Sequence, residues 1–114
     1  MLSKKYKLTD SADFKKVQNE GKVYQSKNFG IAYLKREDAN VSRFAFIISN
    51  KIAKEAVDRN RFKRTMSDAV RLNTIHLLPS FDVVFLAKTS IVNTPASELM
   101  KEVEKGLKES GISN

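Results

Sequence analysis

One stretch, residues 51–71, constrains the fold of this chain more than any other. It contains neither proline nor glycine, and its apolar residues Phe62, Met66 and Val70 recur every four residues. This spacing is typical of a helix with one buried stripe. We therefore predict a helix over about residues 53–72, against which the other elements must pack.

The first part of this stretch, residues 51–64, is strongly basic. It sets six Lys/Arg against two acids, which is half of the net charge of +8. Arg59 and Lys63 are four residues apart, as are Asn60 and Arg64. The two side chains of each pair therefore lie on the same face of the helix, about one turn apart. Arginine binds phosphate bidentately, which suits such a ridge to a nucleic-acid backbone. The alternative is a solvated helix face without a ligand.

The positive charge is concentrated in the first 64 residues. Residues 1–36 carry nine Lys/Arg against three acids, whereas residues 65–114 carry five against six. A segregated basic surface steers a protein towards polyanions and makes binding sensitive to salt. An anionic membrane is the competing partner, but neither of the first two predicted helices has the wide apolar face of an interfacial anchor. No apolar run suggests a signal peptide or a membrane span, so we expect no membrane partner.

Cap and stop signals place a first helix over about residues 11–20. Asp10 or Ser11 can cap its start, and Gly21 is predicted to end it in a left-handed conformation. Residues 1–7 precede it as a basic lead that we expect to be loose in the free protein.

Two extended segments follow, over residues 22–36 and 43–49. Their alternating apolar residues predict strands, the first with an optional break near Ser26. We predict that they pair antiparallel across the short acidic loop of residues 37–40. The nearly continuous apolar run at residues 82–87 predicts a central strand covered on both faces.

The last helix is predicted to begin at Pro95, with Thr94 as its cap. The order of elements predicts a single α/β (α+β) domain over residues 1–114, a sandwich built on one mixed sheet. The chain has no cysteine, and its single histidine, His76, lacks a nearby catalytic partner. We expect no catalytic side chain and no metal or phosphate-loop motif of the protein's own.

The segment Arg59-Asn60-Arg61-x-Lys63-Arg64 resembles the signature of the bacterial ribonuclease P protein subunit. Further segments match that family in order, namely Leu8-Thr9 through Phe14-x-x-Val17 and Gly21, the Phe29 strand, Ile47-Ile48-Ser49-x-Lys51, Ala56-x-x-Arg59 and Asp82 to Lys88. The resemblance implies an α-β-β-β-α-β-α order with three helices and a four-stranded mixed sheet in a two-layer sandwich, similar to the second domain of ribosomal protein S5.

The resemblance also implies a function. In that family the RNA subunit is the catalyst and uses bound Mg²⁺ to remove the 5′ leader of precursor tRNA, while the protein improves substrate and metal affinity in the cytoplasm. It implies as partners the ribonuclease P RNA and the precursor tRNA leader, and it implies no cofactor held by the protein itself. Neither the residues nor the resemblance identify a protein partner or assign a metal site on the chain. The residues that it assigns to the RNA subunit are Lys51, Lys54, Arg59, Asn60, Arg61, Lys63 and Arg64, and those that it assigns to the leader cleft are Phe14, Val17 and Phe29.

Three alternatives remain open. Phe14 and Phe29 also fit plain core positions. The chain could be a general basic ribosomal or RNA-chaperone-type protein, which charge and fold do not separate from a ribonuclease P subunit. A self-sufficient nuclease would need a catalytic constellation that we do not find. Relatives often carry an aromatic where this chain has Gln18, and Arg and Glu where it has Ser67 and Asp68, so we expect altered leader stacking and an RNA contact that ends near Arg64.

Overall fold

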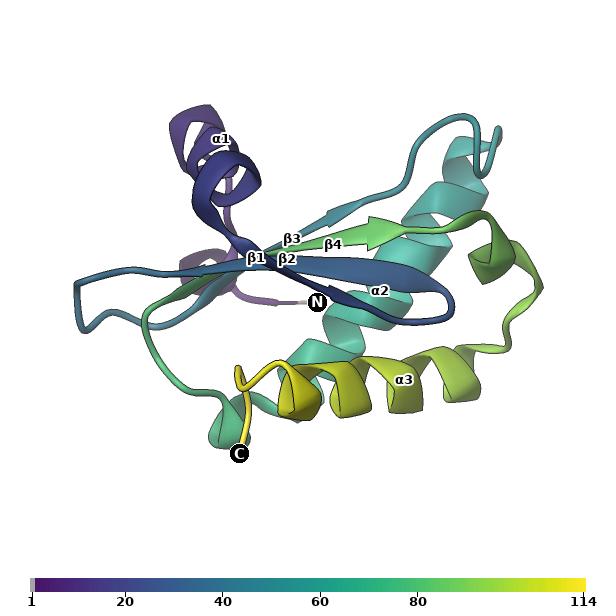
Figure 1. The fold of residues 1–114 in the computed structure, drawn as a ribbon. Coiled ribbons are helices and arrows are strands. Elements are labelled where there is room, and N and C mark those ends of the chain that lie inside the picture. Colours follow the sequence, from purple (N-terminus) through teal and green to yellow (C-terminus); the bar gives the residue numbers. More distant parts are fainter. Residues whose placement is uncertain (1) are drawn as a thin grey trace.

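The structure is a computed structural model that describes residues 2–114. The described residues form three helices and four strands in the order α-β-β-β-α-β-α, as the resemblance implied (Figure 1). Their bounds are α1 Ser11–Glu20, β1 Lys22–Gln25, β2 Phe29–Lys35, β3 Arg43–Ile47, α2 Ala56–Leu72, β4 Phe81–Ala87 and α3 Ala96–Glu109. Short 3₁₀ turns occupy Lys4–Tyr6, Thr74–His76 and Thr89–Asn93.

β4 lies inside the sheet, whose strand order is β1-β2-β4-β3. It pairs antiparallel with β2 and parallel with β3, which confirms the predicted central position. The predicted cover on both faces is incomplete, because Leu86 of β4 is 42% exposed. The prediction that the strands at 22–36 and 43–49 pair directly is wrong, although the break near Ser26 is confirmed. A largely apolar strand is best buried between two neighbours, and residues 36–42 are long enough to pass the roughly 10 Å of two strand spacings.

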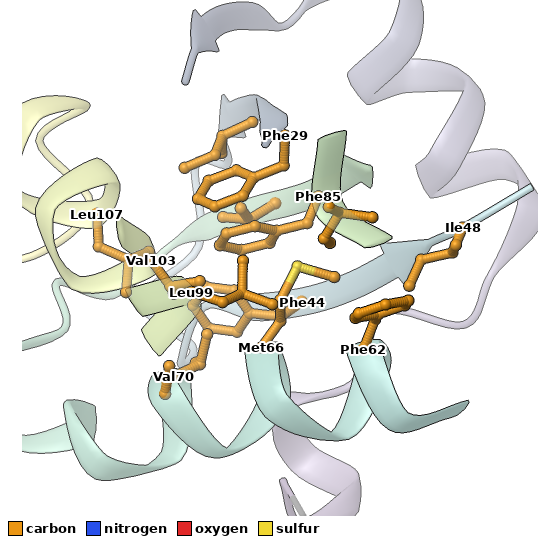
Figure 2. Packing of buried hydrophobic residues seen from close by; sticks show 14 of the residues in the cluster. Phe29, Phe44, Ile48, Phe62, Met66, Val70, Phe85, Leu99, Val103 and Leu107 are labelled. Atoms are coloured by element: carbon orange, nitrogen blue, oxygen red, sulfur yellow. The ribbon is translucent and has the colours of Figure 1, made fainter. Parts of the chain in front are cut away.

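The strands divide their side chains between two faces of the sheet. α2 and α3 cover one face, and α1 lies on the other (Figure 1). The main core lies under α2 and α3 and includes Phe29, Phe85, Met66 and Leu107 (Figure 2). A smaller cluster under α1 comprises Leu8, Val17, Ala32, Ala45 and Val84. The sheet with α2 and α3 is thus the main layer pair, and α1 adds a smaller cover on the second face.

The two ends of α1 are fixed differently from each other. Asp10 caps the start as predicted, because its Oδ1 accepts a hydrogen bond from the Ala12 amide at 2.8 Å. Gly21 does not adopt the predicted left-handed conformation, since its φ is −76°. A Cβ at this position would lie 2.4 Å from the Val17 carbonyl oxygen and 2.8 Å from that of Tyr33. Glycine is therefore required here for close backbone approach.

The predicted cap of the last helix and the predicted loose N-terminal segment both need correction. Thr94 does not cap α3, because its hydroxyl donates to the Ser90 carbonyl, and Pro95 occupies the N-cap position without a side-chain bond. The basic lead is anchored within its described part: Leu2 is buried in the main core, and the Leu8 amide donates to the Phe44 carbonyl at 2.9 Å. Met1 lies outside the described residues.

Candidate nucleic-acid interface

An apolar depression lies between α1 and the sheet face that α1 partly covers. Phe14, Val17 and Gln18 of α1 form one side of it. Its floor consists of the strand residues Ala32, Ile47, Val84 and Leu86. Ile47 and Leu86 are 41% and 42% exposed. α1 therefore leaves apolar sheet surface uncovered, which is the kind of surface on which unpaired bases can pack.

A second depression lies between the N-terminal segment, α1, β3 and α2. Its lining combines aromatic and apolar side chains, among them Phe14 and Phe46, with three cations, Lys7, Lys63 and Arg64. Asn60, Thr9 and Ser67 add polar groups. Phe14 lines both depressions, so they meet at its ring. We call the two together the Phe14 groove.

The basic residues of α2 point in different directions. Asn60, Lys63 and Arg64 line the Phe14 groove. Arg61 lies instead beside a separate hollow at the start of α3, with its guanidinium carbon 4.9 Å from the centroid of the Phe62 ring. Its Nη2 also lies 3.5 Å from Asp58, and the Arg61 side chain stays 62% exposed. The signature thus offers cations on more than one side of α2.

Arg59 turns back towards the loop that precedes α2. Its Nη1 donates to the Ala53 carbonyl at 2.8 Å and to the Lys54 carbonyl at 2.7 Å. Arg59 therefore fixes the chain that enters the helix. Both bonds come from Nη1, so the hydrogens on Nε and Nη2 can still meet a phosphate.

A charged cluster joins α1 to the strand ends on the same sheet face. Asp82, whose side chain is 4% exposed, accepts hydrogen bonds from Arg36 at 2.5 Å and from Arg43 at 2.9 and 2.8 Å. Arg43 also pairs with Asp13 of α1 at 3.2 Å. The hydrogen bond to Asp82 raises the pKa of Arg43, although partial burial opposes the shift. These ion pairs tie α1 to β3 and β4.

Comparison with known proteins decides the family. A family model described as Ribonuclease P matches residues 2–111. The chain belongs to the ribonuclease P protein family. A ribonuclease P protein component from Caldanaerobacter subterraneus is 34% identical over 98% of this chain and 95% of the relative. One from Clostridioides difficile is 31% identical over 93% and 92%. The solved Staphylococcus aureus RNase P protein superposes with a TM-score of 0.88 at 21% identity, over 96% of this chain and 98% of that one.

The structure brings together two of the three residues that the ribonuclease P resemblance assigned to a cleft. Phe14, half-buried, and Val17, buried, both line the Phe14 groove. Phe29 does not, because it is fully buried on the opposite face of the sheet, with its ring centroid 5.4 Å from that of Phe85. Its placement in the same cleft needs correction: Phe29 is a core residue, as strand alternation alone suggested.

The residues assigned to the RNA subunit do not form one row. Lys51 and Lys54 are exposed in the loop before α2, and the remaining five lie in its first three turns. Of the two departures on α2, Ser67 is buried and its hydroxyl accepts the Leu2 amide at 3.2 Å. Gln18, the departure on α1, lines the apolar depression.

Sequence reasoning missed several groove residues. Lys7 reaches the site because the N-terminal segment bridges to β3 at Phe44, a long-range contact that no local pattern signals. Ile47 and Leu86 could have been found from the alternation of their strands, since each follows a core residue and therefore faces the other side.

Residues 2–114 have neither a cluster of metal-ligating side chains nor a membrane-spanning helix. They contain no group of three or more His, Cys, Asp or Glu side chains placed to hold a metal ion. No helix in this part of the chain is long and apolar enough to cross a membrane.

Proposed function

We propose that this chain is the protein subunit of a ribonuclease P ribonucleoprotein that removes the 5′ leader of precursor tRNA. The observation that carries the proposal is the Phe14 groove. In it an uncovered apolar floor meets a wall of cations at one aromatic ring. Proteins that hold single-stranded RNA combine these two features, because bases stack on apolar or aromatic surface while cations follow the phosphates. Family membership supplies the RNA partner.

In this proposal the leader lies along the groove as a single strand. Phe14 and the sheet residues Ile47 and Leu86 offer surface to the bases. Asn60, Lys63 and Arg64 of α2, together with Lys7, contact phosphates of the leader or of the ribonuclease P RNA. Lys51, Lys54, Arg59 and Arg61 extend the basic surface towards the RNA subunit. The contacts supply affinity and orientation, and no protein side chain takes part in bond cleavage.

The chemistry belongs to the RNA subunit with its bound Mg²⁺. Water attacks the phosphodiester between leader and mature tRNA, which leaves a 3′-hydroxyl on the leader and a 5′-phosphate on the tRNA. The protein contributes by placing the leader and by offsetting phosphate repulsion, which lowers the Mg²⁺ concentration that the complex needs. Its cellular location in this proposal is the cytoplasm.

The test is cleavage of precursor tRNA at low Mg²⁺ by a bacterial ribonuclease P RNA, with and without this protein. We expect cleavage when both are present and a 5′-phosphate on the mature product. Salt-sensitive RNA binding without stimulation would favour the second reading, a general basic RNA-binding protein. Cleavage by the protein alone would contradict both readings.

A further inference from the structure

α1 carries one side of the Phe14 groove, yet its contact with the sheet is limited. The buried cluster beneath it is the smaller of the two cores and contains three alanine and valine residues from the strands, Ala32, Ala45 and Val84. Small side chains bury little area, so they fix the position of a helix less firmly than a large core does. The exact placement of α1 therefore depends on its additional ties.

One of these ties is an ion pair formed by Asp13, the residue that directly precedes Phe14. Asp13 Oδ2 lies 3.2 Å from Arg43 Nη2, and the two side chains are 31% and 30% exposed. Asp13 and Phe14 are adjacent in α1, so the position in which this pair docks the helix also affects where Phe14 lies. The pair thus lies next to the residue that lines both depressions.

Arg43 is held in place by contacts other than the one with Asp13. Its Nε and Nη2 donate to the two oxygens of Asp82 at 2.9 and 2.8 Å, a bidentate arrangement that fixes the guanidinium plane. Asp82 is buried and also bound by Arg36, whose own fork holds Asp38 at 3.0 and 3.1 Å. The chain of ion pairs gives α1 a rigid docking point on the sheet.

The docking point and the open floor lie at opposite ends of the same two strands. Arg43 and Asp82 are register partners at the start of β3 and β4, and Ile47 and Leu86 are register partners near their ends. α1 is therefore fixed at one end of the strands while the groove stays open at the other. A tie at this end can set the width of the groove without filling it.

We propose that Asp13 is a positioning residue that docks α1 on the Arg43–Asp82 pair and thereby sets Phe14 and the width of the groove for a single-stranded RNA segment. This inference rests on the proposed function, because it assigns a role within the same groove. The competing account is a surface ion pair with little effect on stability and none on RNA.

A change in charge and a loss of positioning predict opposite changes in affinity for RNA when Asp13 is neutralised. Asp13→Asn removes a negative charge from a protein that binds a polyanion, so charge alone predicts tighter RNA binding. Loss of positioning predicts weaker binding of the leader. A decrease in affinity for RNA with a leader therefore cannot come from the change in net charge.

The experiment measures the affinity of the reconstituted holoenzyme for precursor tRNA with a leader and for the same tRNA without one. For Asp13→Asn we expect the gain in affinity due to the leader to fall about three- to tenfold, a part of what one stacked base contributes. Leaderless affinity should not fall, and the melting temperature should stay close to that of the unaltered protein. Asp13→Glu, which keeps the charge, should restore part of the loss.

Glu104→Gln is the matched control. It removes the same charge from a half-exposed ion pair with Lys108, 3.3 Å long, on α3. An Asp13→Asn protein that behaves like this control, or that loses affinity equally with and without the leader, overturns the inference.

Phe14→Ala separates this inference from the proposed function. If Phe14→Ala reduces the contribution of the leader and Asp13→Asn does not, the positioning role fails and the groove stands. If Phe14→Ala also leaves that contribution unchanged, the assignment of the groove itself fails.

Discussion

At the scale of single residues, Arg59 and Arg61 share one signature but have different surroundings. Arg59 gives two hydrogen bonds to backbone carbonyls, whereas Arg61 is largely exposed against Phe62 and Asp58. We expect Arg59→Ala to lower the free energy of unfolding by about 1–3 kcal/mol, because two carbonyls lose a charged donor. Arg61→Ala should cost about 1 kcal/mol or less.

Arg61→Ala should still reduce the salt dependence of RNA binding, by roughly one phosphate contact. Urea denaturation together with RNA titration at several salt concentrations checks both halves of this prediction. Equal losses of stability in the two variants would contradict the anchoring role of Arg59.

Phe14 and Phe29 form a second contrasting pair. Phe29 is fully buried against Phe85, so Phe29→Ala should cost about 3–5 kcal/mol. Phe14 is half-buried at the groove, and Phe14→Ala should cost clearly less while weakening binding of a single-stranded leader by about 1–3 kcal/mol. Thermal unfolding and leader affinity, measured on both proteins, provide the check. A Phe14→Ala protein as unstable as Phe29→Ala would make Phe14 a plain core residue.

At the scale of elements, the sequence predicted the individual helices and strands better than it predicted which strands lie side by side. The helix at residues 11–20 and the break near Ser26 follow from caps, alternation and turn residues, which act within a few positions. The pairing of β2 with β3 was predicted wrongly, because a short loop suggests a hairpin while the inserted strand β4 comes more than thirty residues later. Gly21 was correctly predicted to end the first helix, but for the wrong reason. Glycine is needed there partly because of the close Tyr33 carbonyl, which belongs to another element and could not be foreseen from local sequence.

The contact between β1 and α3 has a testable pH dependence. The hydroxyl of Tyr24 donates to Glu109 at 2.5 Å, and this hydrogen bond is the main cause that raises the pKa of Tyr24 to about 12 from 10.0. The raised pKa means that this contribution to stability is present below pH 10 and is lost as the pH rises towards 12. Glu109→Gln should bring the pKa of Tyr24 back towards 10.0, because the carboxylate charge is removed.

Ultraviolet absorbance of tyrosinate during an alkaline titration measures this shift. Tyr24→Phe identifies which part of the titration curve belongs to Tyr24. A late-titrating tyrosine that persists in Tyr24→Phe would show that the assignment to Tyr24 is wrong.

At the scale of the whole molecule, the sequence predicted a basic helix and an aromatic cleft as separate features. The structure joins them at Phe14, because the edge strand β3 and the N-terminal segment lie between α1 and α2. The basic composition predicted a polyanion partner, but which cations share one groove depends on tertiary contacts such as the bridge between Lys7 and Phe44. Lys7 therefore could not be assigned from its position in a basic lead.

This arrangement predicts that the location of charge matters more than its amount. We compare Lys7→Ala/Lys63→Ala/Arg64→Ala, which removes the cations of the Phe14 groove, with Lys101→Ala/Lys105→Ala/Lys108→Ala, which removes three from α3. Both proteins lose three positive charges, so any effect of net charge is the same in both.

With a single-stranded leader oligonucleotide, the groove variant should lose about two units of the slope of log affinity against log salt, near 0.7 per phosphate contact. The α3 variant should keep its slope, since its lysines lie on another side of the molecule and two of them pair with Glu109 and Glu104. Equal loss in both proteins would mean that RNA is attracted by the total charge of the chain, and the groove would then have no special role in binding.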